Sequence, residues 1–374
     1  MTAVAVLSPP DSLVTAPDLP EGLETPCAVV DLDRLERNIA RMQALADRGG
    51  VALRPHAKTH KSVRVAALQR AAGARGLTVG TIGEAEVFAD AGFDDLFLAY
   101  TVWAEGEKGR RLRALHERIA LRVGVDSAEG AELLGRAVAG SARPLEVLVE
   151  LDSGEHRAGV TPDESVAVAR AADRAGLRPI GVYTHGGHAY EAGLVAGAAA
   201  DEIRVVDGAA EALRGAGFEV SVLSVGSTPT ASRGVTAPAT EMRPGTYAYH
   251  DRGQVWLGSC APTDIAFWVA GTITSLAVPG QAIVDAGAKA FGRDTLRMAP
   301  GLGLLPTLPG IVRTVNDYHG YVEPLGAGRG RLGQVLPIAP NHVCPVVDHH
   351  AETIVIRGGE VVDVWPVDAR GRFR

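Results

Sequence analysis

The stretch that decides the fold is residues 145–185, which read LEVLVELDSGEHRAGVTPDESVAVARAADRAGLRPIGVYTH. A β-branched, apolar run at 145–151 comes first, and in the pattern that follows at 165–175 apolar residues recur every three or four positions. Gly176 ends that pattern, as glycine often does at a helix C-terminus, and a second β-rich run occupies 179–185. The stretch therefore predicts one strand, helix, strand unit.

The same unit repeats on both sides of this stretch, because β-rich runs alternate with Ala-rich helical patterns from about residue 26 onward. Eight such runs in sequence are typical of a (β/α)8 TIM-like barrel. An open doubly wound α/β sheet is the alternative, although it usually has fewer strands. The predicted strands are 51–56, 77–81, 96–100, 119–125, 145–151, 179–185, 220–225 and about 241–247.

The pattern changes after about residue 254, where Ala-rich helices give way to β-rich runs punctuated by Gly and Pro. We therefore predict a barrel over 30–253 and a second, mainly antiparallel β domain over 254–374. The segment Cys27–Leu32 precedes the first helix and could pair with that sheet, so about 1–29 is assigned to the β domain as well. Met1–Gly22 lacks the features of a secretory signal and is predicted to be a loosely ordered lead-in.

The composition excludes several classes of function. A formal net charge of −7 and the lack of a basic stripe with interleaved aromatics argue against a nucleic-acid partner. No run approaches the length of apolar residues that a membrane-spanning helix needs. Three scattered cysteines do not make a disulfide framework, which leads us to expect a reducing, cytoplasmic compartment.

The first motif with chemical potential is RPHAKTHK at 54–61, at the end of the first predicted barrel strand. Barrel enzymes carry catalytic groups at the C-terminal ends of their strands. Lys58 lies among cations and imidazoles, and like charges would lower its pKa, as a Schiff-base lysine requires. The alternative is a basic turn on the surface.

Small residues follow the last two predicted strands, at Gly226-Ser227-Thr228 and Gly245-Thr246-Tyr247. Free backbone N–H groups and hydroxyls bind phosphate, and barrels often do so in the loops after strands seven and eight. An ordinary Gly/Ser/Thr turn is the alternative.

Two further loops carry polar side chains. Arg157, after the fifth strand, could reach an anionic group or a ring nitrogen, or could simply pair with Asp152 or Glu155. Tyr183 and His185, at the end of the sixth strand, suit proton transfer or stacking against a flat cofactor. A structural role for both is the alternative.

His342 and Cys344 lie two residues apart on what reads as an extended segment, so both side chains could reach one ion. Imidazole and thiolate favour zinc over magnesium, and two ligands fit an open catalytic ion better than a structural one. A buried cysteine beside a structural histidine is the alternative.

Together these motifs resemble the pyridoxal-phosphate lyases of the D-serine dehydratase and D-threonine aldolase family, which share the alanine racemase type of barrel plus β domain (fold type III). The resemblance extends from TPCAVVDLD at 25–33 to VWPV at 364–367. It implies that Lys58 forms the Schiff base with the cofactor. The residues implied to bind the phosphate or the pyridine ring are Arg157, Tyr183, Gly226, Ser227, Thr228, Gly245, Thr246 and Tyr247.

By the same resemblance, His342 and Cys344 would bind a divalent metal near the substrate's β-hydroxyl, with zinc favoured and manganese the other candidate. Aldolases of the family tend to have Asp as the second ligand, whereas this chain has Cys344, as the dehydratases do. The stretch Tyr183–His188 also looks closer to the dehydratases.

We therefore expect a lyase that dehydrates a D-3-hydroxy amino acid, such as D-serine, to a 2-oxo acid and ammonia. Lys58 would take the α-proton. The alternative is cleavage to glycine and an aldehyde, with His60 or His185 as the base. More remote are a non-catalytic pyridoxal-phosphate-binding protein and a racemase, which would need a second catalytic tyrosine. The resemblance also implies a homodimer.

Overall fold

The computed structural model describes residues 10–326 and 328–374, and the chain divides into two compact units. The barrel unit comprises Arg41–Lys58, Val65–Gly245 and Gly371–Arg374. The β unit comprises Met1–Ala40, Thr59–Arg64 and Thr246–Arg370, of which residues 1–9 and 327 lie outside the described part. The domain boundaries given above remain a prediction.

Within the described residues, the barrel unit holds eight parallel strands in the order β2-β9-β8-β7-β6-β5-β4-β3. A parallel bridge between His56 and Thr78 joins the two ends of that order, so the sheet closes into a barrel. The predicted (β/α)8 barrel is thereby confirmed. The strands are β2 Ala52–Leu53, β3 Leu77–Val79, β4 Asp95–Thr101, β5 Ala120–Val125, β6 Glu146–Leu151, β7 Arg178–Thr184, β8 Val222–Val225 and β9 Glu241–Met242.

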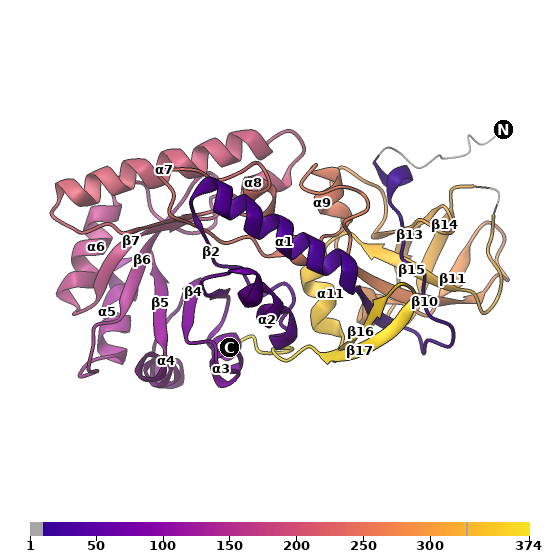
Figure 1. The fold of residues 1–374 in the computed structure, drawn as a ribbon, viewed down its shortest axis with the longest axis horizontal. Coiled ribbons are helices and arrows are strands. Elements are labelled where there is room, and N and C mark those ends of the chain that lie inside the picture. The colour runs from indigo at the N-terminus through magenta and orange to yellow at the C-terminus, as the bar shows by residue number, and fades with distance from the viewer. Residues whose placement is uncertain (1–9, 327) are drawn as a thin grey trace. The chain divides into compact units, whose positions relative to one another are not determined.

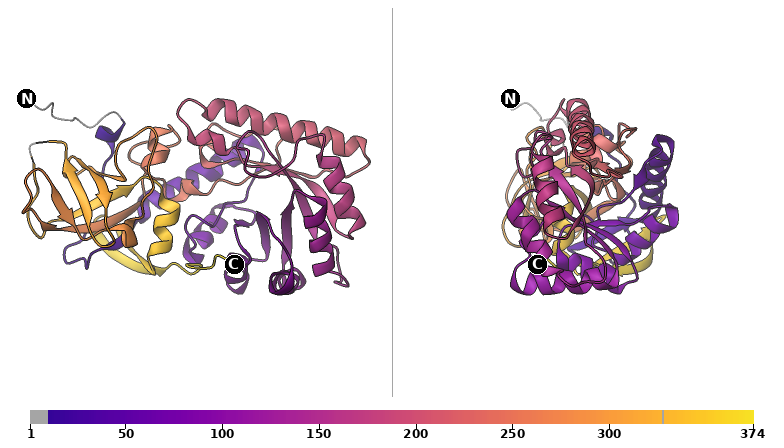
Figure 2. Two further views of the ribbon diagram at one scale, coloured as in Figure 1. Left: turned by 180° about the vertical axis from the view of Figure 1, so that it is seen from behind. Right: turned by 90° about the vertical axis from the view of Figure 1, so that its left-hand side faces the viewer.

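Helices form the outer layer around these strands (Figure 1), and Figure 2 shows the same layers from behind and from the side. Side-chain caps fix several starts: Thr81 accepts the N–H of Glu84, and Ser127 accepts that of Gly130. The helices are α1 Leu32–Gly49, α2 Val63–Ala72, α3 Ile82–Asp90, α4 Gly106–Arg118, α5 Ala128–Ala137, α6 Ser165–Arg174, α7 Val195–Gly215 and α8 Thr228–Ala231, with the 3-10 helix η2 Gly187–Tyr190.

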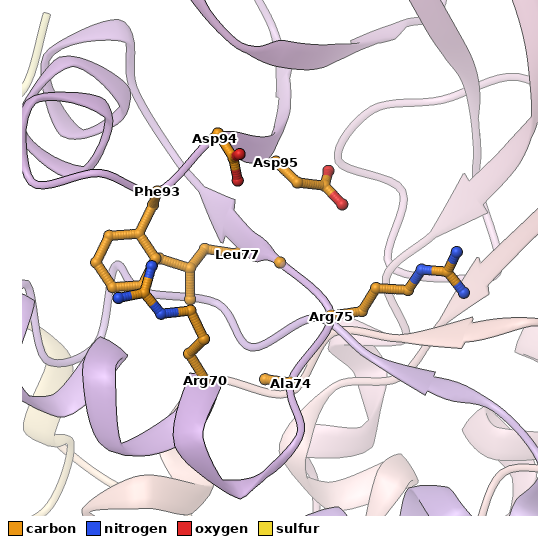
Figure 3. Close-up of a pocket in the computed structure, with 8 residues that line it drawn as sticks. Arg70, Ala74, Arg75, Leu77, Phe93, Asp94 and Asp95 are labelled. Atoms are coloured by element: carbon orange, nitrogen blue, oxygen red, sulfur yellow. The ribbon is translucent and has the colours of Figure 1, made fainter.

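The two ends of the barrel differ. Figure 3 shows a pocket of about 30 Å³ at the N-terminal ends of β3 and β4, where Arg70 lies over the Phe93 ring and Asp95 lies close by. Barrel enzymes place their chemistry at the opposite, C-terminal face, so this small pocket is not the candidate site.

Among the described residues, nine strands form the sheet of the β unit, in the order β11-β14-β13-β12-β15-β10-β1-β16-β17. A β10–β11 pairing closes the first six, and every pairing is antiparallel except β1–β16, so the mainly antiparallel prediction is confirmed. β1 lies inside the sheet, as the sequence suggested. The strands are β1 Cys27–Asp31, β10 Phe267–Ser275, β11 Ala282–Val284, β12 Gly303–Leu305, β13 Gly310–Val315, β14 Gly320–Pro324, β15 Val335–Pro340, β16 Glu352–Arg357 and β17 Glu360–Pro366.

Short helices complete the β unit: η1 Asp11–Leu13, η3 Thr246–Ala248, α9 Arg252–Trp256, α10 Ala288–Phe291 and α11 Val343–His349. The prediction of a loosely ordered lead-in is wrong for its described part. The buried Asp11 carboxylate accepts two hydrogen bonds from the buried Arg252 guanidinium (3.0 and 2.7 Å) and one from the Trp256 indole, and Val14 enters the core. Residues 1–9 of that prediction lie outside the described residues.

Across the ranges that the structure describes, none of the helices combines the length and the apolar character that crossing a membrane would require.

Candidate active site

Lys58 lies at the C-terminal end of the first barrel strand. Its side chain is exposed, whereas its neighbours Ala57 and Thr59 are buried. The backbone N–H of Lys58 donates to Nδ1 of His56, whose own backbone bridges to β3. Pairing between strands therefore fixes the backbone before the lysine, while its amine stays free to reach a ligand.

The prediction that unpaired like charges surround Lys58 is wrong. Arg54 is buried and donates to Glu241 (2.7 Å) and to both oxygens of Asp95 (2.7 and 2.9 Å). Lys61 is buried against Asp348, with 2.8 Å between Nζ and Oδ2. Each of these cations is thus neutralised by a carboxylate, a pairing that the one-dimensional run of residues does not show.

The two histidines proposed as bases have different surroundings. His60 belongs to the β unit and is fully buried, and its Nδ1 accepts the N–H of Ser62 (3.1 Å). His185 follows β7 in the barrel unit. Burial lowers the pKa of His185 well below its ordinary value, and the charges of Lys58 and two arginines lower it further. The imidazole of His185 therefore stays neutral, and a neutral imidazole can accept a hydrogen bond from a ligand.

Tyr183 lies in the barrel interior. It is fully buried, packs edge-on against Phe97 with the ring centroids 5.0 Å apart, and its hydroxyl donates to Glu150 (2.7 Å). Burial raises its pKa well above the ordinary value, and the Glu150 carboxylate raises it further. The phenol thus stays protonated, and any role beside a cofactor ring remains a prediction.

Arg157 is half exposed and pairs with Glu155, with 3.3 Å between Nη1 and Oε2, as one alternative foresaw. Its Nη2 also lies 4.0 Å from Glu150. Asp152, the other foreseen partner, binds His156 instead. Arg157 can reorient toward a ligand, because it is held at a surface where salt bridges are weak.

The buried cation of this region is Arg243, directly after β9, which the sequence analysis did not single out. Its Nε donates to the Ser224 hydroxyl (2.7 Å), its Nη2 donates to the Thr184 carbonyl, and its guanidinium lies 5.1 Å from the Tyr183 ring centroid. The sequence signal that could have identified Arg243 is its position at the C-terminal end of a barrel strand, where barrel enzymes carry functional groups.

The predicted phosphate-binding residues fall into two groups. Gly226, Ser227 and Thr228 follow β8, where Ser227 caps α8 in a reciprocal capping box with Thr230. Gly245 also belongs to the barrel unit, and β8 and β9 pair side by side, so the structure brings these residues together. Thr228 is buried and Gly226 has a φ of +93°, as a tight cradle of backbone would require.

Thr246 and Tyr247 belong to the β unit, in η3. The Thr246 hydroxyl lies 3.8 Å from Cys344 Sγ, and Tyr247 is fully buried. Their part in phosphate binding remains a prediction.

His342 and Cys344 flank the start of α11, so the expected extended segment is wrong. His342 occupies the N-cap position and Cys344 lies in the first helical turn. The helix begins there because the buried Asp251 carboxylate accepts the N–H of Val343 (3.0 Å), a partner ninety-two positions away in the sequence.

The pair nevertheless fits a metal. His342 Nδ1 is bonded to Asp294 Oδ2 (2.9 Å), the His342 side chain also shares a hydrogen bond with Cys344, and Cys344 Sγ lies 3.3 Å from the Thr59 hydroxyl. Burial opposes protonation of His342, but Cys344, Asp294 and Asp251 outweigh it and raise its pKa to about 11. No cluster of three or more His, Cys, Asp or Glu side chains suited to a metal occurs in the described ranges, so this pair would leave coordination positions open.

A closed (β/α)8 barrel with an exposed lysine after its first strand, together with a β unit that carries an imidazole and thiol pair, is typical of the class of alanine-racemase-type pyridoxal-phosphate enzymes. The model of the alanine racemase N-terminal domain matches residues 30–253, and that of a putative serine dehydratase domain matches residues 266–356. The chain belongs to the pyridoxal-phosphate-dependent family of D-serine dehydratases and D-threonine aldolases and is a lyase.

Curated relatives agree on the family. A D-threo-3-hydroxyaspartate dehydratase of Delftia sp. (strain HT23) is 41% identical over 348 residues, covering 86% of this chain and 91% of the relative. A D-threonine aldolase of Arthrobacter sp is 34% identical, covering 94% of each chain. A D-serine dehydratase of Dictyostelium discoideum is 27% identical, covering 86% and 90%.

Solved structures give the same picture. The Delftia dehydratase superposes with a TM-score of 0.84 at 37% identity, covering 92% of this chain and 97% of that one. A D-threonine aldolase from Filomicrobium marinum gives 0.87 at 30% identity, covering 96% and 100%.

Proposed function

We propose that this chain is a pyridoxal-phosphate- and metal-dependent ammonia-lyase that dehydrates D-3-hydroxy amino acids, D-serine being the simplest. The observation that carries the proposal is the imidazole and thiol pair of His342 and Cys344, whose side chains share a hydrogen bond and so lie within reach of one ion. In aldolases of the family, by the resemblance above, the second ligand tends to be a carboxylate.

Relatives support the metal assignment. A D-threo-3-hydroxyaspartate dehydratase has been solved as a histidine-to-alanine variant, and also as a cysteine-to-alanine variant in the metal-free form. The two replaced positions lie two residues apart, as His342 and Cys344 do. We take zinc as the metal, because a thiolate with an imidazole suits zinc better than manganese.

Pyridoxal phosphate, when bound, supplies an electron sink for the carbanion at Cα, and the metal supplies a Lewis acid for the β-hydroxyl. The chain's own residues do the rest. Lys58 Nζ binds the cofactor and takes the α-proton. The loop Gly226–Thr228 and Gly245 form the phosphate site, and the N–H groups of Gly226 and Ser227 shape that loop through their bonds to Glu202 and Thr230.

Aldol cleavage is the second candidate, favoured by the D-threonine aldolase of Arthrobacter sp, which aligns with 94% of this chain. In that reaction His185 or His60 would take the proton of the β-hydroxyl. The burial of His60 favours His185 for this role.

Product analysis on D-threonine separates the two reactions. We expect 2-oxobutanoate and ammonia, and we expect pyruvate from D-serine. Glycine and acetaldehyde from D-threonine would instead make the chain an aldolase.

Lys58→Ala should abolish both the visible absorbance of the bound cofactor and turnover, and a chelator should abolish turnover alone. Retention of both properties by Lys58→Ala would contradict the proposal, and inactivity on every D-amino acid would favour a non-catalytic cofactor-binding protein.

We further propose a homodimer, as the resemblance implies. Sedimentation or light scattering of the purified full chain would measure its mass in solution.

A further inference from the structure

One buried carboxylate joins the two loops that carry the predicted base and the predicted phosphate site. Glu202, on α7, is 2% exposed. Its Oε1 accepts the N–H of Gly186 at 2.7 Å and the N–H of Gly226 at 3.2 Å. Gly186 directly follows His185 after β7, and Gly226 opens the loop after β8, so a single oxygen atom ties together the ends of two barrel strands.

The glycines at the two positions have different reasons. A Cβ added at Gly186 would lie 2.9 Å from Glu202 Oε1, closer than real Cβ contacts, so a side chain there would push the loop and the carboxylate apart. Gly226 has a φ of +93°, which side chains rarely adopt, so the backbone of its loop requires glycine.

Glu202 also reaches the short helix beyond the second loop, through a hydrogen bond with the Thr230 side chain. The Thr230 hydroxyl in turn accepts the N–H of Ser227 (2.9 Å). Glu202 thus supports the loop Gly226–Thr228 from both sides.

Arg243 complements this carboxylate. It is buried, it attracts Glu202, and it donates to the Thr184 carbonyl and the Ser224 hydroxyl, which precede the same two loops. Burial raises the pKa of Glu202, whereas the hydrogen bonds and Arg243 lower it. Burying a carboxylate without partners is costly in free energy. The three donors and the cation offset that cost and hold the Glu202 carboxylate in one place.

We propose that Glu202 is a positioning residue that sets the geometry of the phosphate loop Gly226–Thr228 and of His185 together. The inference rests on the proposed function, in which that loop binds the cofactor's phosphate. Without the carboxylate, the N–H groups of Gly186 and Gly226 lose their acceptor and both loops relax. Affinity for the phosphate falls, and the imidazole of His185 is no longer fixed.

The test compares pyridoxal phosphate with pyridoxal, which lacks the phosphate. The full-length chain, freed of cofactor, is titrated with each compound, and dissociation constants are read from absorbance. Glu202→Ala should raise the dissociation constant of pyridoxal phosphate about tenfold or more, because two buried N–H groups lose their acceptor. The dissociation constant of pyridoxal should rise by less than about twofold. Glu202→Gln keeps an oxygen acceptor at the same place and should stay within about threefold of the wild type.

A matched control is Val205→Ala, which removes a buried apolar side chain from the same helix and no hydrogen bond. It should lower stability and leave the ratio of the two affinities unchanged. If Glu202→Ala weakened both compounds equally, or neither, the inference would be wrong. If Glu202→Ala failed to fold, Glu202→Asp would replace it, because its shorter side chain withdraws the acceptor from both N–H groups: a selective loss of affinity for pyridoxal phosphate would support the inference, and an equal loss or none for the two compounds would overturn it. A wild-type chain in which borohydride traps no pyridoxal phosphate on Lys58 would overturn the proposed function itself, and this inference with it.

Discussion

The sulfur of Cys344 has a hydroxyl beside it that the sequence could not reveal. Thr59 Oγ1 lies 3.3 Å from Sγ, and Asp294 binds Nδ1 of His342, the other proposed metal ligand. Such outer contacts orient the ligands of a metal and raise its affinity. The geometry of the metal pair therefore depends on residues from two distant parts of the chain.

We predict that Thr59→Val and Asp294→Asn each weaken metal binding about 10- to 100-fold, the usual cost of losing such a contact. Thr246→Val is the control, because its hydroxyl is farther from the sulfur, at 3.8 Å, and a smaller effect is expected. Competition with a chromophoric chelator measures the affinity. Equal affinities in the wild type and in both variants would show that these contacts do not support a metal.

The residues of the site were predictable where a short motif carries them. Lys58, His342 and Cys344 each lie in a local pattern whose residue types suggest the chemistry. Arg243 and Glu202 were missed, because their importance arises from burial and from partners on other strands and helices. The cationic cluster around Lys58 was misread for the same reason, since Asp95, Glu241 and Asp348 are distant in the sequence.

At the scale of elements, the eight barrel strands were predictable because apolar runs and helical periodicity alternate regularly. The start of α11 was not, because its capping acceptor, Asp251, is far away in the sequence. Asn341 is of a usual N-cap type, but it stands one position before the N-cap His342, and its side chain bonds to Arg252, Asp294 and Gly301 instead. The sequence therefore predicts an extended segment at His342 and Cys344, because the contact that starts the helix there is tertiary. The relative placement of the two side chains could be seen only in the structure.

The strands at the base of the barrel are joined by Arg54, which follows β2 and binds Glu241 of β9 and Asp95 of β4. We predict that Arg54→Leu lowers the free energy of unfolding by about 3–5 kcal/mol, because it leaves the Glu241 carboxylate buried beside a weaker partner. Urea denaturation measures the change. Arg178→Ala, which removes an exposed partner of Glu146, should cost at most about 1 kcal/mol. Similar losses in the two variants would contradict the argument.

For the whole molecule, the pH dependence of stability follows from Cys27, a free thiol in β1 that lies between β10 and β16. Burial and the nearby Asp285 carboxylate raise its pKa from 9.0 to about 11. The unfolded chain releases this proton first, so the contribution of the thiol to stability is complete below pH 9 and is lost between pH 9 and 11.

We therefore predict that the free energy of unfolding of the wild type falls more steeply between pH 9 and 11 than that of Cys27→Ala. The difference should stay below about 1.4 kcal/mol per pH unit, the limit for one proton, because the side chain is only partly buried. Val30→Ala, which changes a side chain of the same strand without removing an ionisable group, serves as the control and should keep the wild-type slope. Parallel slopes for the wild type and Cys27→Ala in urea titrations would show that the thiol ionises as freely in the sheet as in the unfolded chain.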